Sequence, residues 1–150
     1  MSDGIKIVTE NRKAFHNYSI EEKCEAGIVL TGTEVKSLRD GKANLSDAYA
    51  VFQKSELFLI NAHIPVYAQG NLNNHAPLRT RKLLLHAHEL DKLTSKIQIR
   101  GYSLIPLKMY FKKGICKVEL GLGKGKKSHD KRDAEKEKDV KRAMAQLKKR

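Results

Sequence analysis

The sequence predicts a mainly β fold, a small and partly open β-barrel with two or three added helices and a basic C-terminal tail. Three observations lead to this expectation. Before residue 123, short segments of apolar residues, or of alternating apolar and polar residues, recur as in β-strands. Two segments between them have apolar residues at helical spacing. After residue 122 comes a lysine-rich segment with almost no apolar residues to bury. We therefore expect one domain over residues 1–122 and a tail over residues 123–150 that is disordered when free.

The first half of the chain shows the pattern of a strand, a short helix and a hairpin. Residues 26–31 form an apolar run flanked by charge, as expected of a buried strand. Residues 34–40 fit a short helix that Gly41 ends. Residues 48–52 and 57–60 are apolar runs separated by four polar residues, a spacing typical of a β-hairpin.

The second half repeats this alternation of helix and hairpin. Leu90, Leu93 and Ile97 recur at helical spacing, and Gly101 follows them, which predicts an amphipathic helix that covers the sheet. In residues 107–122, an apolar run precedes a Lys-Lys-Gly turn, after which apolar and polar residues alternate. This pattern predicts a second antiparallel hairpin with one buried face.

Residues 67–81 between these elements are dense in turn-forming residues. The segment ends in a cluster of cations, Arg79, Arg81 and Lys82. We interpret it as a surface loop whose cations suit an RNA backbone, the alternative being a solvated loop with no partner.

The distribution of charge indicates a phosphate-rich partner. The chain carries a net charge of +13, and residues 123–150 hold twelve Lys/Arg against five Asp/Glu. Cations that neutralise phosphates release counterions, which gives affinity that is independent of sequence and falls with salt. Nucleic acid is therefore the expected partner class. A membrane-binding helix is the alternative for the tail, although its apolar stripe has only Val140, Met144 and Leu147 and no aromatic residue.

The remaining composition predicts a cytoplasmic protein without disulfides. No window holds the roughly 20 apolar residues of a membrane span, and no apolar run follows a basic stretch at the start. Cys24 and Cys116 lie far apart and lack CxxC spacing, which argues against a disulfide framework and a zinc site.

Two histidine clusters offer the alternative of a metal-dependent nuclease. His86, His88 and Glu89 form an HxHE cluster, and His129 with Asp130 forms an acid/base pair among cations. The first cluster lacks a third ligand motif, so a structural or helix-entry role suits it better. The second lies in a Gly/Lys-rich segment, whereas catalysis needs groups held by a packed shell. We therefore expect no catalytic residue, no metal and no cofactor.

Five segments, in order along the chain, resemble one bacterial family. They are NRKAFHNY (11–18), EAGIVLTGTEVKSLR (25–39), GKANLSDAY (41–49), RTRKLLLH (79–86) and GKGKKSHDKR (123–132). The chain resembles the SsrA-binding protein family, also called small protein B. The resemblance implies an oligonucleotide-binding (OB-like) β-barrel that binds the tRNA-like domain of transfer-messenger RNA (SsrA). It also implies delivery of that RNA to stalled ribosomes for trans-translation, which rescues the ribosome and tags the nascent peptide for degradation.

The resemblance also implies which residues bind RNA. The family's RNA-binding residues fall on Asn11, Glu25 and Leu84. Taken without the resemblance, Asn11 would cap a turn before a strand, Glu25 would be a solvated strand end, and Leu84 would belong to the core. The cations expected at the RNA backbone are Lys13, Lys36, Arg39, Arg81, Lys82, Lys124, Lys126 and Lys127. Two departures from the family pattern are Ala76, where an acidic residue is common, and the pair Lys23 and Cys24.

For the tail, the resemblance implies a contact with the 70S ribosome. The residues expected there are His129, Asp130, Lys131 and Arg132, at the small-subunit decoding region and in the empty mRNA channel. Weak i,i+3 and i,i+4 charge pairs favour a helix in residues 130–142 once the tail is bound. Elongation factor Tu, with the charged RNA, is a further candidate partner. A constitutive ribosomal or RNA-chaperone protein shares every compositional feature and stays open as an alternative.

Overall fold

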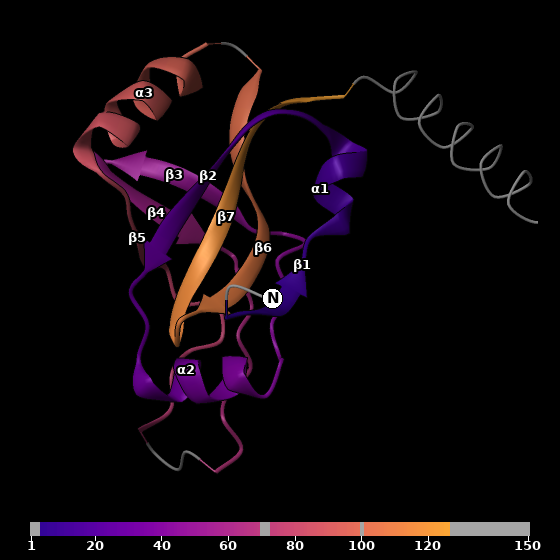
Figure 1. Ribbon diagram of the computed structural model, residues 1–150, viewed down its shortest axis with the longest axis vertical. Helices are drawn as coiled ribbons and strands as arrows, with labels where there is room; N and C mark the ends of the chain where they lie inside the picture. The colour runs from indigo at the N-terminus through magenta and orange to yellow at the C-terminus, as the bar shows by residue number, and fades with distance from the viewer. Residues whose placement is uncertain (1–3, 70–72, 100, 127–150) are drawn as a thin grey trace, which may run out of the picture.

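The computed structural model describes residues 4–69, 73–99 and 101–126 (Figure 1). Over these residues, the fold is mainly β with three helices, as expected. The elements in chain order are β1 (Ile5–Glu10), α1 (Arg12–Asn17), β2 (Tyr18–Ile28), α2 (Gly32–Arg39), β3 (Tyr49–Gln53), β4 (Glu56–Ile60), β5 (Arg81–Leu84), α3 (Ala87–Ile97), β6 (Tyr102–Lys112) and β7 (Ile115–Gly125).

The strands form a small antiparallel barrel. Their order is β1-β6-β3-β4-β5-β2-β7, and β6 also pairs with β7, which closes the sheet on itself. One edge of the long strand β6 pairs with β7. The opposite edge has two partners: its C-terminal part pairs with β1, and its N-terminal part pairs with β3 at one residue pair, Leu104 with Ala50. The single registered pair at this seam agrees with the expected partly open barrel.

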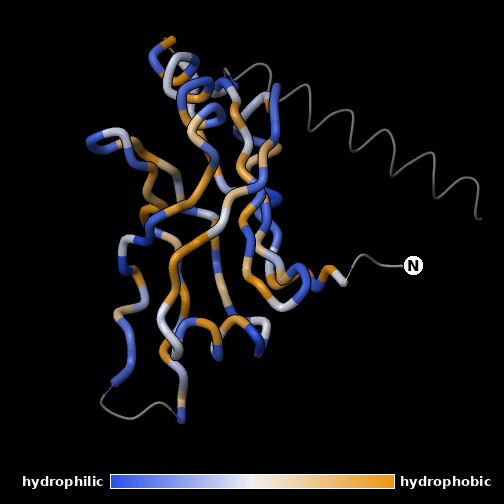
Figure 2. The backbone as a smooth tube through the Cα atoms, turned by 60° about the vertical axis from the view of Figure 1, so that its left-hand side comes forward, coloured by the Kyte–Doolittle hydropathy of each residue, from blue (hydrophilic) through white to orange (hydrophobic). Residues whose placement is uncertain are grey.

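Two helices close the ends of the barrel. Figure 1 shows α2 and α3 at opposite ends, and Leu38 of α2 and Leu93 of α3 both belong to the central apolar core. Between them, hydrophobic stretches run along the strands (Figure 2), where Leu59, Met109 and Leu120 are fully buried. Burying this apolar surface is the main favourable contribution to folding.

Both predicted hairpins and both predicted helices are present. The hairpins are β3 with β4 and β6 with β7, and the helices are α2 and α3. Thr31 caps α2: its side chain accepts the N–H of Glu34, while the Glu34 side chain accepts the N–H of Thr31. Gly41 follows this helix with a φ of 76°, a left-handed conformation that glycine adopts without strain.

The boundary expected after Leu122 is wrong, because β7 continues to Gly125. Gly123 and Lys124 pair with β2 on one side and with β6 on the other, and the Lys126 N–H donates to the Asn17 carbonyl at 2.8 Å. A Cβ at Gly123 would lie 2.8 Å from the Ser19 carbonyl oxygen. This glycine therefore serves close strand packing, whereas the sequence suggested the start of a tail.

The N-terminal elements were not expected from the sequence. They are β1, α1 and the first eight residues of β2, and Asn11 consequently precedes a helix, not a strand. Helix α1 has only six residues, and it buries Ala14 against Ile105 and Leu107 in a small second cluster outside the barrel. Alternate residues of β2 are exposed, a period-2 pattern that could have revealed this part of the strand.

Candidate RNA interface

A groove on the outer face of the barrel brings together two of the three residues that the resemblance singles out. Glu25 of β2 and Leu84 of β5 both line a groove of about 530 Å³, together with the first residues of β7. The strands meet here in register, because Gly27 pairs with Leu84 on one side and with Lys117 on the other. Leu84 is 51% exposed, so it is not a core residue.

Neighbouring side chains hold Glu25 through one of its two oxygens. The Tyr110 hydroxyl donates to Glu25 Oε2, and Lys112 Nζ lies 3.6 Å from the same atom. The hydrogen bond from Tyr110 lowers the pKa of Glu25 against the opposing effect of partial burial, and Lys112 and Lys117 lower it further. The carboxylate is therefore ionised at neutral pH. Among the described residues, no partner lies on Oε1, which leaves that oxygen as an acceptor for a ligand.

Asn11 lies in a different cleft and is tied into the fold. Its side-chain amide donates to the carbonyls of Leu45 at 3.1 Å and Pro106 at 2.9 Å, and its own N–H donates to the Leu107 carbonyl at 2.7 Å. The residue is 4% exposed, and its Oδ1 has no partner among the residues described. With Lys13 it lines a cleft of about 490 Å³ between α1, β3 and β6. Its amide thus joins three segments and does not cap a turn.

The prediction that Arg81 contacts the RNA backbone is wrong, because this side chain is fully buried. Its Nε donates to Glu34 Oε2 at 2.5 Å, and its two terminal nitrogens donate to the carbonyls of Ala62 at 2.6 Å and Pro77 at 3.0 Å. A guanidinium with these partners holds the start of β5 in place and cannot reach a phosphate.

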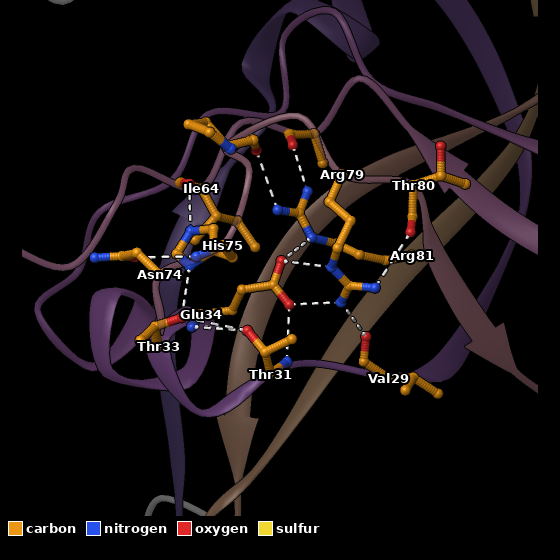
Figure 3. A network of polar contacts seen from close by, with 12 residues as sticks. Val29, Thr31, Thr33, Glu34, Ile64, Asn74, His75, Arg79, Thr80 and Arg81 are labelled. Atoms are coloured by element: carbon orange, nitrogen blue, oxygen red, sulfur yellow. Dashed lines mark hydrogen bonds and ion pairs between the residues drawn. The ribbon is translucent and has the colours of Figure 1, made fainter. Parts of the chain in front are cut away.

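Glu34 is the centre of this network (Figure 3), and the sequence interpretation did not single it out. The fully buried carboxylate accepts from Arg81, from Arg79 Nη2 at 2.6 Å and from the Thr31 N–H at 2.8 Å. Burial raises the pKa of Glu34, but the bonds from Arg79, Thr31 and Arg81 outweigh it and lower the pKa overall. The sequence TGTE at 31–34 carries the capping-box signal that could have indicated this residue.

The same network holds the segment before β5. His75 Nε2 donates to the Ile64 carbonyl at 2.8 Å, and the hydroxyl of Thr33 lies 2.9 Å from His75 Nδ1. The Asn74 side chain bonds to both backbone groups of Tyr67. His75 therefore links the segment before β5 to α2, and the Ala76 carbonyl accepts the N–H of Arg79 at 3.1 Å.

The other predicted cations that lie in the described residues are at least partly exposed, and several have partners within the protein. Lys82 Nζ lies 3.4 Å from Glu56, and the ammonium groups of Lys36 and Lys124 lie over the rings of Tyr67 and Tyr102. Lys126 donates to the Phe15 carbonyl at 3.1 Å, while Lys13 and Arg39 are exposed. Lys127, His129, Asp130, Lys131 and Arg132 lie outside the described residues.

The histidines considered as metal ligands stand at the start of α3. His86 and His88 stack with ring centroids 5.8 Å apart, and Glu89 accepts the N–H of His86 at 3.4 Å, as suits a helix entry. In the described part of the chain, no group of three His, Cys, Asp or Glu residues could hold a metal ion. Burial raises the pKa of Cys24 to about 11 and that of Cys116 to about 12, so both thiols are protonated at neutral pH.

None of the helices in residues 4–69, 73–99 and 101–126 is long and apolar enough to cross a membrane.

Comparisons with known proteins agree on one family. A family model described as SmpB protein matches residues 8–150. The SsrA-binding protein of Geobacter sulfurreducens is 59% identical over 143 residues, which cover 95% of this chain and 94% of the relative. That of Syntrophobacter fumaroxidans is 57% identical over 145 residues (97% and 90%), and that of Bacillus pumilus 56% over 139 residues (93% and 89%). A chain from a solved structure described as "tmRNA-SmpB: a journey to the center of the bacterial ribosome" is similar with a TM-score of 0.68 and 51% identity, covering 80% of this chain and 85% of that chain.

Proposed function

The chain belongs to the SmpB protein family, and from this membership we propose that it binds transfer-messenger RNA (SsrA) and delivers it to stalled ribosomes for trans-translation. The observation that carries the proposal is the family match over residues 8–150, which includes both the barrel and the basic C-terminal segment. The +13 net charge supports it, because both partners are polyanions.

In this proposal the two parts of the chain have different tasks. The barrel, whose last strand ends at Gly125, grips the tRNA-like domain, with Glu25 and Leu84 in the outer groove as directed contacts. Residues 127–150 contact the small subunit near the decoding region and enter the mRNA channel when no message occupies it. Lys13, Lys36, Arg39, Lys82, Lys124, Lys126 and Lys127 supply backbone contacts that position the RNA without reading its sequence. Elongation factor Tu, as carrier of the charged RNA, remains a candidate partner.

A competition experiment tests the proposal against a general RNA-binding role. The tRNA-like domain and ribosomal RNA fragments of equal length compete for the chain at several matched salt concentrations. We expect the chain to bind the tRNA-like domain more tightly than the ribosomal RNA fragments at every salt concentration. We also expect the bound RNA to be recovered intact with or without a chelator. Equal competition would favour a constitutive ribosomal or chaperone role, and cleavage that a chelator stops would identify a nuclease.

We predict that Glu25→Ala weakens binding of the tRNA-like domain by about 1–3 kcal/mol, because a directed hydrogen-bond acceptor is lost. The change makes the protein more positive, so nonspecific attraction to phosphates alone predicts tighter binding. Asp91→Ala is the matched control, since this exposed residue of α3 lies outside the groove and its loss changes the charge equally. Gel-shift titration of both folded variants measures the difference. Equal affinities would mean that Glu25 makes no directed contact with the RNA.

A further inference from the structure

A cleft of about 520 Å³ lies beside the hairpin of β3 and β4, at the end away from its turn. The described residues that line it are Asn44, Asp47, Asn61, His63 and Leu78, and none of these is Lys or Arg. The whole chain, in contrast, has 30 Lys and Arg against 17 Asp and Glu. A cleft with a carboxylate and no lining cation repels phosphate, so it suits a cationic or neutral ligand.

Backbone hydrogen bonds fasten the walls of this cleft to one another. The backbones of Asn44 and His63 exchange two bonds, of 2.9 and 3.0 Å. The next residue, Ile64, donates its N–H to the Pro77 carbonyl at 3.0 Å. The side chain of Asn44 also accepts a backbone N–H at 2.8 Å, which folds the turn before β3. The cleft thus has its shape before a ligand arrives, which reduces the entropy lost on binding.

Three polar side chains of the cleft are exposed and available to a ligand. Among the described residues, no hydrogen bond, ion pair or ring contact engages the side chains of Asp47, Asn61 or His63. Leu78, which is 55% exposed, adds an apolar surface. The cleft therefore offers a carboxylate, an amide, an imidazole ring and an aliphatic group.

These four groups match the side chain of arginine. A guanidinium donates two parallel hydrogen bonds to a carboxylate, and its further N–H groups can bond to an amide oxygen such as that of Asn61. Its flat face stacks on rings such as that of His63, and its methylene stem packs on aliphatic side chains such as Leu78. The ammonium group of lysine has no flat face to stack, and the phosphates of RNA are repelled by Asp47.

We propose that this cleft binds an arginine side chain of a protein partner, with the guanidinium on Asp47. The proposal rests on the proposed function, which brings the chain to the ribosome, and it names a protein of the ribosome as the partner. Proteins that bind ribosomal RNA are basic, and arginine is the side chain best suited to phosphate contacts, so arginine-bearing segments are available there.

Asp47→Asn separates an arginine site from an RNA contact, because the two predict opposite results. The change keeps the shape of the side chain and makes the chain more positive, so an RNA contact predicts equal or tighter binding to stalled ribosomes. We expect the variant, in complex with transfer-messenger RNA, to bind purified stalled ribosomes about tenfold more weakly. Its affinity for the tRNA-like domain should be unchanged. Asp91→Asn is the matched control, since this exposed residue of α3 does not line the cleft and its charge change is equal.

Asn61→Gly is a second variant that leaves the backbone unstrained. Asn61 has a φ of 62°, a left-handed conformation that glycine adopts at least as readily. Because the change removes only the amide side chain, we expect ribosome binding to weaken several-fold while the melting temperature does not fall.

A photocrosslink from the cleft identifies the partner directly. With p-benzoylphenylalanine in place of Leu78, the full chain is bound with transfer-messenger RNA to purified stalled ribosomes and irradiated. We expect a crosslink to an arginine-containing segment of a ribosomal protein, and its loss when Asp47→Asn is added. Crosslinks to ribosomal RNA alone, or wild-type ribosome binding by folded Asp47→Asn, would overturn the arginine site while leaving the proposed function intact. If Asp47→Asn does not fold, the crosslink of the otherwise unmodified chain decides. Failure of the wild-type chain to bring transfer-messenger RNA to stalled ribosomes would instead overturn the proposed function.

Discussion

Glu34→Ala is expected to lower the free energy of unfolding by about 3–5 kcal/mol, because it leaves the guanidinium of Arg81 buried without its charged partner. Both side chains are fully buried, and Arg79 and the Thr31 N–H lose the same acceptor. Chemical denaturation measures the effect. The matched control is Glu56→Ala, which breaks a surface pair with Lys82 whose side chains are 50% and 42% exposed. This control should change stability by about 0.5 kcal/mol or less.

The pH dependence of this effect has a definite sign. The pKa of Glu34 is lower in the folded protein than in the unfolded chain, so its ionisation stabilises the fold above the unfolded pKa of about 4.3. That contribution is lost as the pH falls through the folded pKa. The difference in free energy of unfolding between the wild type and Glu34→Ala should therefore be largest at neutral pH and decrease at acidic pH. A difference that stays constant from neutral to strongly acidic pH would contradict the stabilising ionisation of Glu34.

Replacing Asp130, Lys131 and Arg132 together with alanine is expected to abolish peptidyl transfer to transfer-messenger RNA while RNA binding and recruitment to the ribosome persist. The net charge falls only from +13 to +12. Alanine also has the highest helix propensity, so the change does not remove a helix on intrinsic grounds. The expected loss therefore reflects directed contacts with ribosomal RNA. Peptidyl transfer is measured on ribosomes stalled at a message end, with recruitment followed separately.

Salt dependence separates this result from a simple electrostatic tether. If the tail acts only through its positive charge, transfer should fall slightly and recover at lower salt, because counterion release strengthens phosphate binding there. Normal transfer by the triple variant would rule out directed contacts at these three positions. Loss of recruitment would show that the tail acts at an earlier step than proposed.

Local patterns were sufficient to predict the elements that lie next to one another in the sequence. The hairpin of β3 and β4 follows from two apolar runs around a short polar turn, and α3 follows from the spacing of Leu90, Leu93 and Ile97. The amphipathic face of α3 supplies Leu93 to the core, as helical spacing predicts.

Long-range contacts explain what the sequence did not reveal. Glu34 and Arg81 are 47 residues apart, so nothing near Arg81 in the sequence shows that its charge is buried, and the cluster of cations around it favours an RNA contact. Gly123 resembles the start of a flexible tail, but it is a position where β7 packs against the backbone of β2. In both cases a residue whose local sequence context suggests the surface serves close packing in the interior.

The placement of Glu25 and Leu84 shows the same limit. The family resemblance selected both residues, but their positions 59 residues apart give no sign that they share a groove. Only the pairing of β2 with β5 at Gly27 and Leu84 brings them together. Tyr110, which orients Glu25, comes from a third strand and had no signal in the sequence.

Peptide tagging on ribosomes stalled at the end of a message tests the account most directly. Translation of a message without a stop codon, supplied with transfer-messenger RNA, is compared for the full chain and for a chain that ends at Lys126, where the barrel is complete. The account predicts that the full chain supports tagging, and that the shorter chain retains most of its RNA affinity but yields no tagged peptide. Tagging by the shorter chain, or its absence with the full chain, would contradict it.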